Sequence, residues 1–124
     1  MTALLIAILV LVGGAVGAVV RYVVDGYVKG RAGKSFPWGT LAVNVLGTAL
    51  LGSLHGAGTG TAVEALLGTG LAGALTTFST FELDTVHLIQ DRAYGKAAVN
   101  AIGSLVVGVV VFIVFHALFR ALFP

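Results

Sequence analysis

Four apolar stretches, each long enough to cross a lipid bilayer, constrain the fold of this chain more than any other feature. They cover residues 3–24, 38–55, 62–90 and 97–119. A hydrocarbon core of about 30 Å is crossed by a helix of about 20 apolar residues. Hydrophobic residues make up 58% of the 124 positions and charged residues 10%, which is more apolar surface than a soluble domain of this size can bury. The sequence therefore predicts one all-α domain over residues 1–124, integral to a membrane and in contact with lipid, with four spans and both termini on one side.

Composition also excludes several classes of function. The net charge of +2 is small and the chain has no basic cluster, so we expect no nucleic-acid partner. There is no cysteine, and the three histidines (His55, His87 and His116) fit no zinc-site spacing. Glu82 and Asp84 lack a nucleophile or a base to act with. We therefore expect that the chain is not an enzyme.

Glycine is unusually frequent, at 18 residues. Glycine weakens an isolated helix but lets two helix backbones approach closely in lipid. Gly13 and Gly17 in the first span, and Thr48 and Gly52 in the second, are small residues four positions apart. These pairs predict close helix packing, and four spans enclose so little that we also expect an oligomer.

The nine residues from Gly73 to Phe81 are the most unusual part of the third span. They carry four hydroxyl side chains and two phenylalanines where a membrane helix usually has aliphatic residues. Polar groups at bilayer depth are costly unless they face protein or a water-filled path. We therefore expect a helix that is interrupted near residues 73–76, in the middle of the membrane, beside a path for a small solute. A plain kink, with threonine hydroxyls bonded to the preceding turn, is the alternative.

Polar residues in the other spans have a structural and a functional interpretation. Asn44 shares a helix face with Thr40 and Thr48, either as a bond between helices or as a donor facing the path. Arg21, near the end of the first span, either reaches the lipid headgroups or places a positive charge at the mouth of an anion path.

In the fourth span, small and polar residues recur every four positions, and Asn100 and Ser104 are the members best suited to line a path. Phe78 and Phe81 either pack in the core or turn their electropositive ring edges toward an anion.

Three motifs resemble the CrcB/Fluc family of fluoride channels, and the resemblance extends over the whole chain. They are Gly14-x-x-Gly17-Ala18-x-x-Arg21-Tyr22, Pro37-Trp38-Gly39-Thr40-Leu41-x-Val43-Asn44 and Gly70-x-x-Gly73-x-x-Thr76-Thr77-Phe78-Ser79-Thr80-Phe81. The resemblance implies a passive, fluoride-selective channel that exports fluoride across the cell membrane and so reduces its toxicity. It also implies an antiparallel, dual-topology dimer with two pores.

The resemblance further implies roles for individual residues. Backbone carbonyls of Gly73 and Thr76 from both subunits are expected to hold a structural Na⁺ ion at the dimer interface. Arg21 is expected at the vestibule. Asn100 stands where many relatives have tyrosine. The residues expected to line the fluoride pore are Asn44, Phe78, Ser79, Thr80, Phe81, Asn100 and Ser104.

Two alternatives come from other classes of membrane protein. A small multidrug-type exporter of dual topology has the same size, but it depends on an acidic residue in the first helix, and residues 2–24 contain none. A subunit that only stabilises a partner would not need polar stripes that converge on one route.

The charged loops bear on which chain is the partner in the dimer. Positive charges near membrane helices tend to stay on the cytoplasmic side, and five of them lie on one side against Arg120 on the other. This asymmetry favours one orientation, whereas an antiparallel homodimer needs both. We expect the homodimer, with an oppositely biased paralogue as the other possible partner. The five residues are Lys29, Arg31, Lys34, Arg92 and Lys96.

Overall fold

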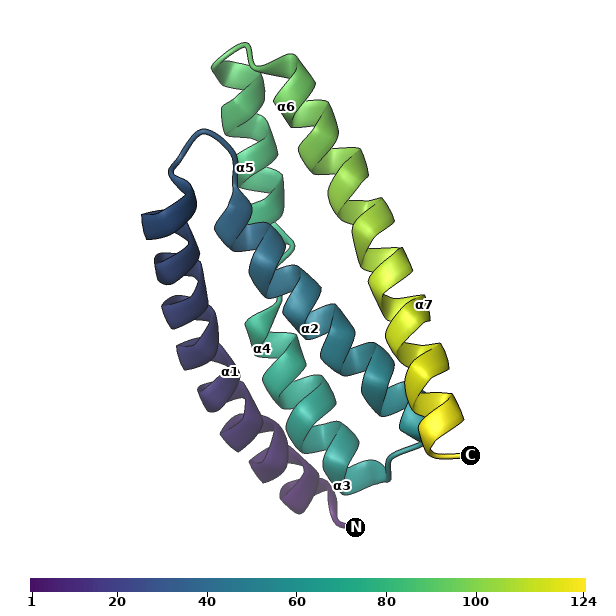
Figure 1. Ribbon diagram of the computed structural model, residues 1–124. Helices are drawn as coiled ribbons and strands as arrows, with labels where there is room; N and C mark the ends of the chain where they lie inside the picture. The colour runs from purple at the N-terminus through teal and green to yellow at the C-terminus, as the bar shows by residue number, and fades with distance from the viewer.

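The structure is a computed structural model that describes residues 1–124 and contains helices only. Four of its helices are long and apolar enough to cross a membrane: Ala3–Ala32, Trp38–Ala57, Thr61–Gln90 and Tyr94–Leu122. Both termini lie at one end of the bundle, and the connections from the first to the second long helix and from the third to the fourth lie at the other (Figure 1). The prediction of an all-α chain with four such helices is confirmed.

The first two long helices are the single elements α1 (Ala3–Ala32) and α2 (Trp38–Ala57). The third and fourth are divided into shorter elements, among them two π-helical segments, η1 and η2. The third consists of α3 (Thr61–Val63), η1 (Glu64–Ala72), α4 (Gly73–Leu75) and α5 (Ser79–Gln90), and the fourth of α6 (Tyr94–Ala98), η2 (Val99–Gly103) and α7 (Ser104–Leu122).

The first helix runs to Ala32, eight residues beyond the end of the predicted span 3–24. Asp25 and Lys29, one turn apart, form an ion pair of 2.9 Å that supports this extra stretch of helix. The helix ends at Ala32 because Gly33 takes a positive φ of 82°, which glycine adopts at little cost. The other three long helices begin and end within three residues of the predicted spans.

The glycine pairs bring helix backbones together, as predicted. Gly13 and Gly17 of α1 are buried, and a Cβ atom at either would overlap the carbonyl of Leu66 or Leu71 in η1. A Cβ atom at Gly52 would come within 2.7 Å of a carbonyl oxygen in α7. Because these positions have no side chain, α1 lies directly against the third long helix and α2 against the fourth.

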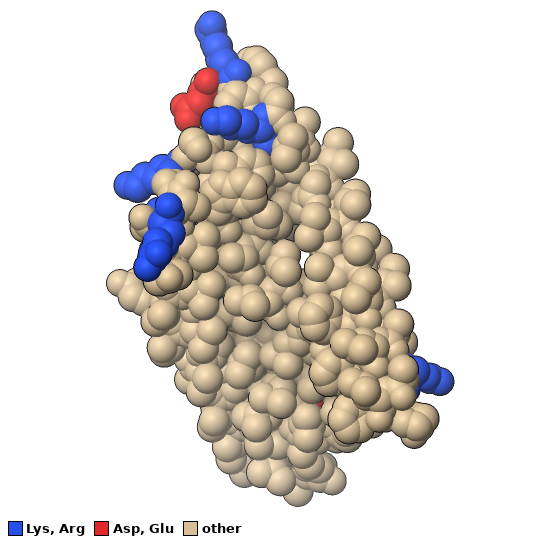
Figure 2. All heavy atoms as spheres, viewed as in Figure 1, with Lys and Arg blue, Asp and Glu red and all other residues tan.

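Most of the apolar surface points outward. Only 17 of the 124 residues are buried, and large aliphatic side chains of α1 and α7 are among the exposed ones. The middle of the molecule shows almost no charge, whereas Lys and Arg side chains gather at the loop end and one basic side chain projects near the termini (Figure 2). This distribution suits a hydrocarbon layer around the middle of the bundle, with water at both ends.

Candidate functional site

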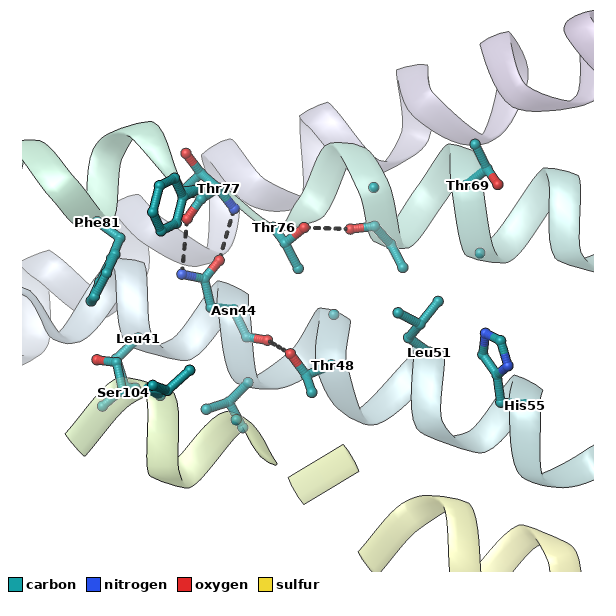
Figure 3. Close-up of a pocket in the computed structure, with 18 of the residues that line it drawn as sticks. Leu41, Asn44, Thr48, Leu51, His55, Thr69, Thr76, Thr77, Phe81 and Ser104 are labelled. Carbon is teal, nitrogen blue, oxygen red and sulfur yellow. Dashed lines mark hydrogen bonds between the residues drawn. The ribbon is translucent and has the colours of Figure 1, made fainter. Parts of the chain in front are cut away.

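A groove of about 760 Å³ runs along the bundle between α2, the η1–α4 segment and α7 (Figure 3). It contains most of the residues selected from the sequence, although they come from three different helices. Arg21, Ser79, Thr80 and Asn100 are not part of its wall. The selected residues that do line it are Asn44, Gly73, Thr76, Phe78, Phe81 and Ser104.

The chain leaves the helical path where the third long helix meets the groove. α4 ends at Leu75, and Thr76 has an extended backbone with φ −82° and ψ 158°. Residues 76–78 are not helical, and α5 begins at Ser79. The Thr76 hydroxyl does donate to the Ala72 carbonyl at 3.0 Å, as in a kinked helix.

The side-chain amide of Asn44 pairs with both polar backbone groups of Thr77. The Thr77 N–H donates to Asn44 Oδ1 at 2.7 Å, and Asn44 Nδ2 donates to the Thr77 carbonyl at 3.0 Å (Figure 3). One hydrogen on Nδ2 is used in this pair, and a primary amide carries two. Asn44 therefore holds the non-helical segment and has one N–H without a partner in this chain.

The same departure from the helix releases two backbone carbonyls. In a continuous helix, the Thr77 N–H would donate to the Gly73 carbonyl and the Thr80 N–H to the Thr76 carbonyl. Here the first donates to Asn44 and the second to the Thr77 hydroxyl at 3.2 Å. These carbonyls are the two that the resemblance to the CrcB/Fluc family assigns to a cation, and the Arg21 guanidinium lies 3.4 Å from the Thr76 carbonyl oxygen.

A small hydroxyl cluster begins α5. Thr77 Oγ1 accepts from the Thr80 N–H in the first turn of α5, donates to Thr80 Oγ1 at 3.2 Å and lies 3.4 Å from Ser79 Oγ. The sequence pointed to Ser79 and Thr80, but it did not show that Thr77 lies at the centre of this cluster and contacts both of them. The signal was its position, three residues before Thr80 at the start of a helix.

Phe78 and Phe81 form a tilted pair on the groove wall, with ring centroids 5.8 Å apart and an angle of 38° between the rings. Phe78 is 69% exposed, and Phe81 is partly exposed. The alternative interpretation, core packing, requires buried rings. In this subunit the Phe78 ring is available to a ligand or to a second protein chain.

The polar face of the fourth long helix is split between two environments. Ser104 lines the groove, and its hydroxyl donates to Asn100 Oδ1 at 3.3 Å. Asn100 is only 1% exposed and donates to the Thr85 hydroxyl at 2.9 Å. Asn100 therefore joins η2 to α5 behind the groove, while Ser104 faces it.

Thr40, Asn44 and Thr48 share one face of α2, but each of them makes different hydrogen bonds. The Thr40 hydroxyl is buried and donates to Asp84 Oδ2 at 2.7 Å, which links α2 to α5. Thr48 donates to the Asn44 carbonyl at 2.6 Å within α2. Only Asn44 combines a bond to another helix with an unused donor in the groove.

The end of the groove nearest the chain termini has a different character. His55 and Glu64 line it there, and Glu64 Oε1 accepts a hydrogen bond of 2.8 Å from the Thr59 hydroxyl. Sequence reasoning did not select Glu64. Its position in the first turn of a span, directly after a glycine-rich turn, was the available signal.

Comparison with known proteins identifies the family. Residues 8–116 match the family described as CrcB-like protein, Camphor Resistance (CrcB). The chain belongs to the CrcB family. This confirms the family predicted from the three motifs and decides against a multidrug-type exporter. With its four long apolar helices, this CrcB protein is a multi-pass membrane protein.

Several relatives carry names that state a function. The "Fluoride-specific ion channel FluC 1" of Streptomyces avermitilis is 50% identical over 105 residues, which cover 82% of this chain and 85% of the relative. The protein of the same name from Nocardia farcinica is 48% identical, with 82% and 71% covered. The "Fluoride-specific ion channel FluC 2" of Mycobacterium bovis is 46% identical, with 86% of each chain covered.

Proposed function

We propose that this CrcB protein is a passive, fluoride-selective channel that lets fluoride leave the cell. The unused N–H of Asn44, a residue that lines the groove beside the non-helical segment, is the observation that carries the proposal. Fluoride is a small anion and a strong hydrogen-bond acceptor, so its hydration must be replaced by donors. Asn44 supplies a donor, and the rings of Phe78 and Phe81 supply positive edges. The names of the relatives agree with this choice of ion.

The channel is an antiparallel dimer with two pores. One subunit leaves the groove open along its side and exposes Phe78. A second copy in the opposite orientation covers the groove and brings the two non-helical segments together at mid-membrane. The twofold axis generates two equivalent pathways, so every contact in one pore recurs in the other.

Fluoride efflux from liposomes that contain only the purified chain tests this function. A fluoride-selective electrode is expected to record rapid release from fluoride-loaded liposomes, and a chloride electrode no release above empty liposomes. Absence of fluoride release from dimeric protein would refute the channel, and equal release of both ions would refute its selectivity. Because the chain is purified alone, the same measurement shows that it needs no other subunit.

A sodium ion between the subunits is the expected cofactor. The Gly73 and Thr76 carbonyls have lost their helical donors, and oxygen ligands suit a hard cation. Two carbonyls from each subunit provide four ligands on the axis. The bound charge also lowers the cost of bringing an anion into a region of low dielectric constant.

Sodium is therefore expected to stabilise the dimer without permeating. At a sodium concentration about 100 times Kd, linkage adds about 2.7 kcal/mol to the free energy of unfolding, which is visible as a higher Tm. The Tm is measured in sodium and in N-methylglucamine salts of equal ionic strength. Equal Tm values in the two salts, across the whole titration, would contradict the site.

Orientation in the membrane tests the homodimer. The basic residues of the loop end (Figure 2) favour that end inside the cell and the termini outside, while the antiparallel homodimer requires both orientations. The chain has no cysteine, so Thr2→Cys introduces a single site for a membrane-impermeant thiol reagent. We expect labelling from both sides when the chain is expressed alone. Labelling from one side only would exclude the homodimer and identify a paralogue of opposite charge bias as the partner.

A further inference from the structure

One face of α1 packs along the third long helix. The residues on this face that make contacts are four positions apart. Gly13 and Gly17 touch the backbone of that helix directly. One turn further on, Arg21 Nη1 lies 3.4 Å from the Thr76 carbonyl oxygen, in the non-helical segment. One turn beyond that, Asp25 reaches the start of α2. Arg21 therefore belongs to the packed face of α1.

The position of Arg21 along α1 separates it from the end of the helix. The helix continues for eleven further residues to Ala32, a rise of about 16 Å. One of the two interpretations of Arg21 from the sequence, a reach to the lipid headgroups, requires a helix end nearby, whereas α1 ends about three turns beyond Arg21. A charged side chain so far from the helix end needs a partner within the protein.

The Thr76 carbonyl is the hydrogen-bond partner of the Arg21 guanidinium in this chain. Asp25, the acidic residue one turn away, is paired with Lys29 at 2.9 Å. The Thr76 carbonyl is free to accept because the Thr80 N–H donates to the Thr77 hydroxyl. A separation of 3.4 Å is long for a hydrogen bond, so attraction between the positive charge and the carbonyl dipole is the larger part of the contact.

We propose that Arg21 is a positioning residue that holds the non-helical segment in place from the side of α1. Asn44 holds the next residue, Thr77, from the side of α2. With both peptide units fixed, the free N–H of Asn44 and the ring of Phe78 keep their places on the groove wall. This role rests on the proposed function, since it concerns the segment that lines the fluoride path.

A positioning role for Arg21 differs from a role as a charge that attracts anions into a vestibule. Arg21 is not part of the groove wall. Attraction over a distance through water is screened at high ionic strength, since the Debye length falls from about 30 Å at 0.01 M to about 3 Å at 1 M. A direct contact between side chain and backbone is not screened in this way.

The test measures fluoride efflux from liposomes for wild-type protein, Arg21→Gln and Arg21→Lys at low and high ionic strength. Arg120→Gln, which removes the same charge near the C-terminus, is the control. We expect Arg21→Gln to lower the flux at least about tenfold at both ionic strengths, and Arg120→Gln to match wild type. Arg21→Lys keeps the charge but is shorter, so its flux is expected to lie between those of wild type and Arg21→Gln.

Hydrogen exchange in the detergent-solubilised dimer provides a second readout. Faster exchange in Arg21→Gln, confined to the backbone amides of residues 76–80, supports the positioning role. Unchanged exchange there, or full flux in Arg21→Lys with a loss in Arg21→Gln that depends on salt, would overturn it. If Arg21→Gln does not assemble, Arg21→Lys still gives both readouts. Wild-type protein without flux would refute the channel itself, which separates that outcome from the failure of this inference.

Discussion

Replacement of Asn44 by aspartate is expected to reduce fluoride flux at least about 100-fold. The change removes Nδ2, which donates to the Thr77 carbonyl at 3.0 Å, and places two acceptors against each other. An unpaired buried polar group costs about 1–3 kcal/mol, and each 1.4 kcal/mol corresponds to about tenfold in rate. The new negative charge also repels an anion where the dielectric constant is low. Efflux from liposomes measures the loss.

The control for this variant is Ser53→Ala, also in α2. The Ser53 hydroxyl donates to the Ala49 carbonyl of the same helix and does not line the groove. Ser53→Ala is expected to keep the wild-type flux, and gel filtration confirms that both variants remain dimeric. If dimeric Asn44→Asp protein conducts as well as wild type, the amide of Asn44 is needed neither by the ion nor by the non-helical segment.

Replacement of Phe78 or Phe81 by isoleucine is expected to reduce fluoride flux about tenfold, with little effect on assembly. Isoleucine is apolar and branched but has no ring, so it removes the positive ring edge while retaining an apolar side chain. Both rings lie on the groove wall, and they contact each other at 5.8 Å between centroids. Because each ring supports the other, the double variant is expected to lose less than the product of the two single losses.

Phe123→Ile is the matched control for the ring variants. Phe123 stacks on Phe119 beyond the end of α7 and is not part of the groove wall. Its replacement is expected to leave the flux unchanged. Wild-type flux in both single groove variants would assign Phe78 and Phe81 to packing alone, for instance against the second subunit.

The sequence by itself determined that this is a membrane protein of four long apolar helices and that it belongs to the CrcB family. Length and hydropathy are properties of consecutive residues, so they can be read without knowing which helices touch. The close approach of Gly13 and Gly17 to a neighbouring helix was also predictable, because small residues four positions apart share one helix face. The non-helical residues are 76–78, which overlap the predicted range 73–76 only at residue 76.

Only the tertiary structure decided which partner each polar side chain has. Asn44 bonds to the backbone of Thr77, 33 residues away, and Arg21 to the carbonyl of Thr76, 55 residues away. Asn100 and Ser104 are one turn apart, yet Asn100 is buried against α5 while Ser104 faces the groove. A repeat along one helix identifies the residues that share a face. The partner of that face depends on how the other helices pack against it, because a donor in the membrane bonds to whichever acceptor the packing brings within reach.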